Sequence, residues 1–137
     1  MIKSSQQLVE QAKGAIREVT VTDLFEALQH ADSILIDVRE PEEFNAGHLA
    51  NSVNFPRGVL EMKIHLHPLV CDLCDKDALE CLAHRPIYLI CRSGARSALA
   101  ALSLKEMGFD QVYSVAGGFI EWVDNNLPVE HRGQACA

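Results

Sequence analysis

Short apolar runs recur along the chain and indicate buried β-strands. Residues 34–38 and 86–90 are almost continuously apolar, which is typical of parallel strands that are covered on both faces. Residues 19–21, 53–55 and 112–115 are shorter segments with β-branched or aromatic side chains, which favour strands. The pattern therefore predicts a sheet of about five strands.

Segments with helical spacing or helix-boundary residues lie between these runs. Thr22 or Asp23 is placed to cap one helix, Pro41 to begin another and Gly108 to end a third. The expected helices cover residues 5–17, 23–29, 41–46, 97–107 and 119–125. Strands that alternate with helices predict an α/β fold with a parallel sheet and right-handed crossovers.

The first expected helix carries an apolar stripe that includes Leu8, Ala12 and Ile16. We expect the stripe to pack on the sheet of its own domain, with a dimer contact as the alternative. The predicted organisation is therefore a helical extension, one domain and a C-terminal tail. Their ranges are 1–18, 19–130 and 131–137.

Composition narrows the class of protein. The chain has 137 residues, 48% of them apolar, a size at which one hydrophobic core is usual. Twelve basic and nineteen acidic residues give a formal charge of −7, which disfavours a nucleic-acid role. No segment approaches the roughly 20 apolar residues of a membrane span, and the N-terminus lacks a signal-peptide core. We expect a cytoplasmic protein that makes no membrane contact.

The cysteines are odd in number, and a chain with a real core has no need of a disulfide scaffold. Reduced thiols are therefore expected. The cysteines are Cys71, Cys74, Cys81, Cys91 and Cys136.

Cys91 follows a predicted buried strand directly, at the edge where parallel sheets bind ligands. Gly94 allows the loop backbone to curl, so that successive N–H groups face the sulfur and favour the thiolate. Arg92 and Arg96 add permanent positive charge. An inert buried cysteine is the alternative, but such a site has no use for two arginines. We interpret Cys91 as a nucleophile.

Four segments resemble the rhodanese family in their order and spacing. They are residues 37–44, 47–56, 91–96 and 117–122. The resemblance implies a three-layer α/β domain whose central parallel sheet has helices on both faces. It also implies transfer of sulfane sulfur from thiosulfate or a persulfide donor to cyanide or a thiol, through a persulfide on Cys91.

The same resemblance assigns the substrate-binding residues and the partners. It implies no cofactor and no metal, and a monomer or weak homodimer is expected. The substrate-binding residues are Arg92, Ser93, Gly94, Ala95 and Arg96.

Two other classes of protein share this loop. A rhodanese-type module that only binds a partner would be signalled by loss of the cysteine, and Cys91 is present. A non-catalytic sulfur-carrier module is the related alternative. Small phosphatases and arsenate reductases are the second class. The phosphatases place one residue more between cysteine and arginine than the four found between Cys91 and Arg96. A shorter loop makes a tighter pocket, which favours a sulfane sulfur.

Several residues outside the loop have expected supporting roles. Asp37 and Arg39 are expected to pair and to tie the strand edge to nearby loops, and they orient the Cys91 loop in the functional interpretation. Arg57 is either a pocket-rim residue or a surface charge. His48 is interpreted as a hydrogen-bonding scaffold residue, because a preformed thiolate needs no histidine base. Gly117–Gly118 predicts a close approach between backbone segments.

A cluster of histidines and cysteines occupies residues 65–84. Cys71 and Cys74 have the spacing of half a zinc site or of a redox pair, and no second such pair completes it. Cys71, Cys74, Ala78 and Cys81 also fall at helical spacing. We favour an apolar helical stripe, with a sulfur-relay thiol and a metal site as the alternatives.

Overall fold

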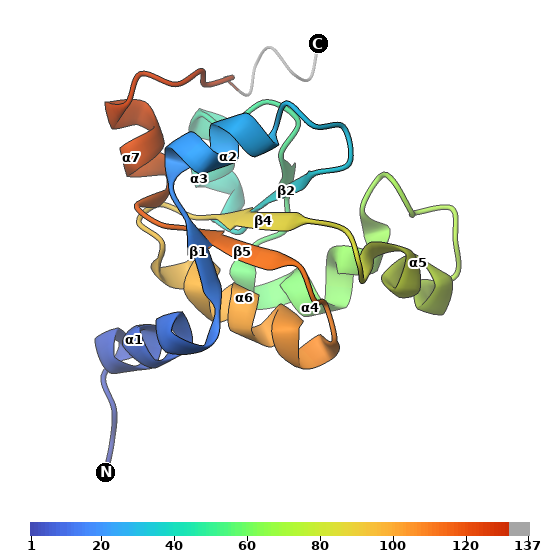
Figure 1. The fold of residues 1–137 in the computed structure, drawn as a ribbon, viewed down its shortest axis with the longest axis horizontal. Coiled ribbons are helices and arrows are strands. Elements are labelled where there is room, and N and C mark those ends of the chain that lie inside the picture. The colour runs from blue at the N-terminus through green and yellow to red at the C-terminus, as the bar shows by residue number, and fades with distance from the viewer. Residues whose placement is uncertain (132–137) are drawn as a thin grey trace.

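Five parallel strands in the order β1-β5-β4-β2-β3 form the central layer of the fold (Figure 1). The computed structural model describes residues 1–131. The strands are β1 (Arg17–Val19), β2 (Ile34–Asp37), β3 (Val53–Asn54), β4 (Ile87–Ile90) and β5 (Val112–Val115). The predicted parallel α/β architecture is confirmed.

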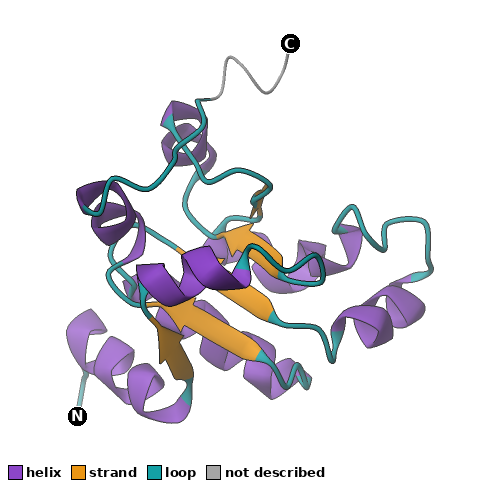
Figure 2. Cartoon of the chain, turned by 45° about the horizontal axis from the view of Figure 1, so that its top comes forward, coloured by secondary structure: helices purple, strands orange, loops and turns teal. Residues whose placement is uncertain are grey.

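Helices cover both faces of the sheet (Figure 2). Within residues 1–131, none of them has the length and apolar character that a membrane crossing requires. The α-helices are α1 (Ser5–Ala15), α2 (Val21–Ala27), α3 (Pro41–Ala46), α4 (Leu60–Lys63), α5 (Asp75–Leu82), α6 (Ala95–Met107) and α7 (Gly118–Asp124). Two short 3-10 helices, η1 (Arg57–Val59) and η2 (Ile64–Leu66), flank α4.

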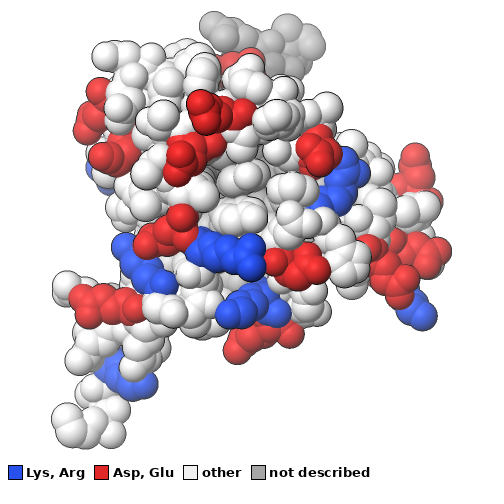
Figure 3. Space-filling view, viewed as in Figure 1, with Lys and Arg blue, Asp and Glu red and all other residues white. Residues whose placement is uncertain are grey.

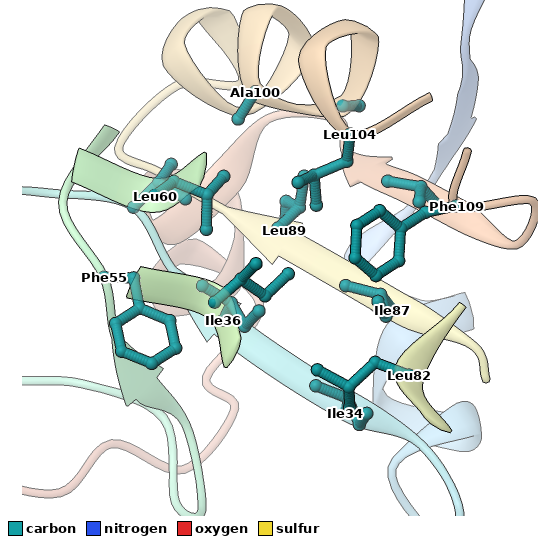
Figure 4. Packing of buried hydrophobic residues seen from close by; sticks show 14 of the residues in the cluster. Ile34, Ile36, Phe55, Leu60, Leu82, Ile87, Leu89, Ala100, Leu104 and Phe109 are labelled. Carbon is teal, nitrogen blue, oxygen red and sulfur yellow. The ribbon is translucent and has the colours of Figure 1, made fainter. Parts of the chain in front are cut away.

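Successive side chains of the buried strands belong alternately to two hydrophobic clusters, one on each face of the sheet. Ile34 and Ile36 of β2 belong to the cluster under α4, α5 and α6, part of which Figure 4 shows. Leu35, between them, belongs to the cluster under α2 and α7. Continuous apolar strands are therefore required, because both faces of the sheet are covered.

Several helix boundaries differ by one or two residues from those predicted, and two of the differences affect neighbouring segments. Helix α2 begins at Val21, because Thr20 caps it and forms a capping box with Asp23, so the strand expected at 19–21 ends at Val19. Helix α6 begins at Ala95, immediately after Gly94. The loop that follows Cys91 is correspondingly short.

Helix α1 packs on α6 rather than directly on the sheet. Ala12 is buried, and Lys105 donates a hydrogen bond of 2.7 Å to the Ala15 carbonyl oxygen. Leu8 of the same helix stays 47% exposed. The chain then enters β1, which pairs with β5 in the sheet. The predicted tail begins at His131, and its remaining residues, 132–137, lie outside the described part of the chain.

The segment between β3 and β4 corrects the interpretation of the cysteine cluster. Cys74 is the N-cap of α5 and Cys71 lies in the turn before it. The buried side chains of α5 are Ala78 and Leu82, whereas Cys71, Cys74 and Cys81 are exposed. The predicted apolar stripe of cysteines is therefore wrong, because the helix starts later and turns a different face inward.

Candidate active site

Cys91 lies at the carboxyl end of β4 with a side chain that is 1% exposed. Its sulfur accepts hydrogen bonds from the backbone N–H of Gly94 at 3.1 Å and of Ser97 at 3.3 Å. Gly94 adopts φ 102°, a left-handed conformation that glycine tolerates without the steric cost of a side chain. The loop backbone therefore curls around the sulfur, as Gly94 predicts.

Helix α7 fixes the backbone of this loop from the other side. The N–H groups of Phe119 and Ile120 donate to the carbonyl oxygens of Cys91 and Arg92 at 2.8 and 3.1 Å. A Cβ atom on Gly118 would lie 2.5 Å from the Cys91 oxygen, so only glycine fits there. This contact is the close approach predicted for the glycine pair. It directs the Cys91 carbonyl oxygen toward α7.

A pair of buried serines completes the surroundings of the sulfur. The Ser97 hydroxyl lies 3.4 Å from the Cys91 sulfur and 2.8 Å from the Ser114 hydroxyl of β5. Both serines are 0% exposed. Sequence reasoning assigned neither residue to the site. Ser114 carried a signal, because it is a polar residue within an otherwise apolar or aromatic strand.

Arg96 is bound to a carboxylate from a distant part of the chain. Its two terminal nitrogens donate to the two oxygens of Glu43 on α3, at 2.7 and 3.1 Å. The hydrogen bonds from Arg96 lower the pKa of Glu43 from 4.5 to about 2. The positive charge of Arg96, which was expected to act on Cys91 and its substrate, is therefore partly neutralised by Glu43, a residue that sequence reasoning did not assign to the site.

The other loop residues differ in their exposure. Arg92 and Ser93 are exposed, Ala95 is half-buried and Gly94 is buried. The Arg92 side chain lines a groove of about 700 Å³ between α3 and α7. The loop thus presents backbone N–H groups to the sulfur, and its Arg92 borders the groove.

Asp37 and Arg39 form a buried ion pair at the carboxyl end of β2. The Arg39 guanidinium donates to Asp37 at 2.9 and 3.1 Å and to the Gly47 carbonyl oxygen at 2.7 Å. It also stacks over the Phe119 ring, 4.2 Å from the centroid. Asn54 bridges the carbonyl oxygens of both residues at 2.9 Å. The predicted pairing is confirmed, and it ties β2 to β3, to the end of α3 and to α7.

Two other candidates lie outside the site. Arg57 bonds to Glu61 and Ser103 at 3.1 Å, which places it among helices rather than at the groove. His48 hydrogen-bonds to the Phe44 carbonyl oxygen at 2.9 Å and stacks on the Phe44 ring, as expected of a scaffold residue.

The histidine and cysteine cluster does not converge on one point. Within residues 1–131, no set of three or more His, Cys, Asp or Glu side chains lies together as metal ligands would. His65 lies 3.6 Å from Asp75, and the buried His67 accepts a hydrogen bond from the Leu69 N–H. Burial lowers the pKa of His67, which favours its neutral form.

The fold agrees with the results of comparison with known proteins. A profile of the rhodanese-like domain family matches residues 20–125, so the chain belongs to the rhodanese-like domain family. The thiosulfate sulfurtransferase GlpE of Glaesserella parasuis is 32% identical over 113 residues, which cover 82% of this chain and 92% of that protein. Other curated relatives are longer, and the chain spans 59% and 26% of two of them.

Solved structures show the same fold. The polysulfide-sulfur transferase homodimer of Wolinella succinogenes superposes with a TM-score of 0.67 at 30% identity, over 93% of this chain and 87% of that one. A protein of unknown function from Rhodopseudomonas palustris, described as a possible tyrosine phosphatase, gives a TM-score of 0.75 at 26% identity, over 95% and 96%.

Proposed function

We propose that the protein is a sulfurtransferase that carries sulfane sulfur as a persulfide on Cys91. The observation that carries this proposal is the pair of backbone N–H groups, from Gly94 and Ser97, that point at the Cys91 sulfur. Donors fixed in this way stabilise negative charge on sulfur before the reaction begins. The sulfurtransferases among the relatives support the same activity.

The reaction consists of two displacements. In the first, the Cys91 thiolate attacks the outer sulfur of thiosulfate, the S–S bond of the donor breaks and sulfite leaves with the electron pair. A persulfide donor reacts in the same way and releases its thiolate. In the second, cyanide or an acceptor thiolate attacks the outer sulfur of the Cys91 persulfide, and the Cys91 thiolate leaves. The loop N–H groups stabilise the charge on sulfur in both steps.

Phosphatase activity is one rival, and the length of the loop argues against it. The interval of four residues between Cys91 and Arg96 leaves less room than the phosphatase loop does. Both terminal nitrogens of Arg96 are bound to Glu43, so phosphate and thiosulfate alike would have to displace that carboxylate. A binding module without catalysis remains the other rival.

Steady-state assays separate these classes. With thiosulfate and cyanide, the wild-type protein should form thiocyanate, and Cys91→Ser should form none because the serine hydroxyl is a far weaker nucleophile. Cys81→Ser, which changes an exposed cysteine of α5, is the matched control and should keep the wild-type rate. Hydrolysis of an aryl phosphate without thiocyanate formation would support the phosphatase instead. If thiosulfate and persulfide donors both fail, the proposed function is wrong.

A further inference from the structure

A groove beside the Cys91 loop is larger than thiosulfate requires. Its volume of about 700 Å³ lies in the range of sites that hold small organic ligands. Arg92 is one of its lining residues, and the Ile120 N–H that binds the Arg92 carbonyl oxygen belongs to α7, one wall of the groove. A molecule in the groove therefore lies next to the residue that follows Cys91.

Most of the groove wall is apolar. Ala46, Phe119, Ile120, Val123 and Val129 line it. Ile120 is 42% exposed and Val123 46%, although both are large aliphatic side chains of the same short helix. Covering them with an apolar group removes this surface from water, which favours binding of a carbon chain along α7.

The charged side chains of the groove favour a ligand with a negative charge near Arg92. Arg39 is neutralised by Asp37, and Glu43 is bound to Arg96. Arg92 lines the groove with no carboxylate within ion-pair distance among residues 1–131. Asp124, at the opposite end of α7, repels an anion there. A carboxylate is therefore favoured at the loop end, beside Arg92, and an apolar group toward Val123.

We propose that this groove binds the sulfur acceptor, and that the acceptor is a small organic thiol with a carboxylate beside its sulfur and an apolar tail. The proposal rests on the sulfurtransferase function proposed above. The carboxylate binds Arg92, and the tail lies over Ile120 and Val123. N-acylated cysteines have this combination of groups.

The transfer step is balanced without any further reactant. The acceptor thiol loses its proton to water, and its sulfur attacks the outer sulfur of the Cys91 persulfide. The S–S bond to Cys91 breaks, and its electron pair returns to the Cys91 sulfur as thiolate. The product is the persulfide of the acceptor. Nothing is oxidised or reduced overall, because the sulfane sulfur moves from one thiolate to another.

A matched set of thiols tests the two recognition elements separately. Protein loaded with sulfur on Cys91 is mixed with N-hexanoyl-cysteine, with N-acetyl-cysteine, which has a short tail, or with N-hexanoyl-cysteamine, which lacks the carboxylate. We expect N-hexanoyl-cysteine to remove the sulfur at least tenfold faster than either of the others, after correction for thiol pKa. Equal corrected rate constants would overturn the proposal.

Two variants locate the effect. Ile120→Asp should abolish the advantage of the long tail, and Arg92→Gln should abolish the advantage of the carboxylate. Ile120→Asp should keep the advantage of the carboxylate, and Arg92→Gln should keep the advantage of the long tail. Each variant is judged by the ratio of its rates with two thiols, and the rate with cyanide, which has no tail, reports whether Ile120→Asp leaves the loop intact. A loss of fold or of loop geometry would slow cyanide and thiols alike, and that result would also contradict the proposal.

Control variants come from the opposite side of the sheet. Leu8 on α1 is 47% exposed, similar to Ile120, and α1 and α7 lie on opposite sides of the sheet in Figure 1. Leu8→Asp and Lys13→Gln make the same changes of polarity and charge there. Neither variant should alter the ratio of the rate with N-hexanoyl-cysteine to the rate with either of the other two thiols. A change as large as that of the groove variants would show that net charge, and not the groove, is being measured.

Binding without chemistry separates this proposal from the proposed function. N-hexanoyl-alanine has the tail and the carboxylate but no thiol, and its binding to the unloaded protein is followed by NMR. We expect shifts at the amides of Phe119, Ile120 and Val123. Amide shifts without any sulfur loading of Cys91 would support ligand binding in the groove and would refute the proposed sulfurtransferase function. Sulfur loading without shifts, as when the groove is closed or filled by the chain itself, would refute the groove alone.

Discussion

At the scale of single residues, the charge near Cys91 is set by backbone and by pairing. The Cys91 sulfur accepts hydrogen bonds from the backbone N–H groups of Gly94 and Ser97. The two terminal nitrogens of Arg96 donate hydrogen bonds to Glu43 instead. An anionic donor must therefore compete with Glu43 for Arg96. The side chain at position 43 should therefore affect kcat/KM for a dianion such as thiosulfate.

Glu43→Gln tests this competition. Removing the carboxylate frees the Arg96 guanidinium for thiosulfate, so we expect kcat/KM for thiosulfate to rise several-fold. Arg96→Ala should lower it by at least tenfold, while stability falls only by the modest contribution of a partly exposed ion pair. Steady-state kinetics with each variant measure both effects. Unchanged kinetics in Arg96→Ala would remove this residue from the site.

The pair of Glu43 and Arg96 makes the free energy of unfolding depend on pH. The pKa of Glu43 is lowered to about 2 in the folded protein by the hydrogen bonds from Arg96. Its stabilising contribution is therefore complete above the usual glutamate pKa and is lost as the pH falls toward 2. Urea unfolding between pH 6 and 3 should show a smaller loss of stability in Glu43→Gln than in the wild-type protein. Parallel losses would contradict this assignment.

Asp37→Ala should be far more damaging. Arg39 is 4% exposed, so removing Asp37 leaves a buried guanidinium without its carboxylate, at a cost of about 3 to 5 kcal/mol. Glu61→Ala breaks a partly exposed pair with Arg57 and should cost about 0 to 1 kcal/mol. Urea denaturation compares the two. Similar small losses in both variants would show that the Asp37 pair does not hold the fold together.

At the scale of elements, α7 depends on a glycine at its start. Gly118→Ala places a Cβ atom 2.5 Å from the Cys91 oxygen at a φ of +56°. The backbone strain alone is worth about 1 to 3 kcal/mol, and the loop must shift, so we expect lower stability and a loss of sulfurtransferase activity. Gly58→Ala is the control, because nothing lies within 4 Å of its Cβ position. Full activity in Gly118→Ala would separate α7 from the loop geometry.

The segment before α5 carries a prediction about metal. Cys71 and Cys74 are exposed and no third ligand lies with them among residues 1–131. We therefore expect elemental analysis of the purified protein to find no stoichiometric zinc. One zinc per chain, lost in Cys71→Ser or Cys74→Ser, would contradict this expectation.

The elements themselves were largely predictable from local patterns. Strands β2 and β4 are apolar on both faces, and Pro41 and Gly94 mark a helix start and a loop turn by their own backbone chemistry. The pairing of Arg96 with Glu43 was not predictable, because the residues are 53 positions apart and Arg96 was assigned to the substrate rather than to a carboxylate of the chain. The inward face of α5 also escaped prediction, since it depends on where that helix begins.

At the scale of the whole molecule, parallel strand order brings the site together. Strands β2 and β5 lie on either side of β4, so Asp37, Cys91 and the turn before α7 meet at one edge of the sheet. On the face shown in Figure 3, acidic and basic side chains are intermixed, in keeping with a net charge of −7. Local donors, rather than a broad basic surface, must therefore attract an anionic substrate.

The central claim is that Cys91 carries sulfur, and intact-mass spectrometry tests it most directly. Incubation with thiosulfate, or with a persulfide donor, should add the mass of one sulfur atom to the wild-type protein, and cyanide should remove it. Cys91→Ser should gain nothing, whereas a double change of the exposed Cys71 and Cys74 should still be loaded. A wild-type protein that gains no sulfur from either donor, or a Cys91→Ser variant that still gains it, would contradict the account.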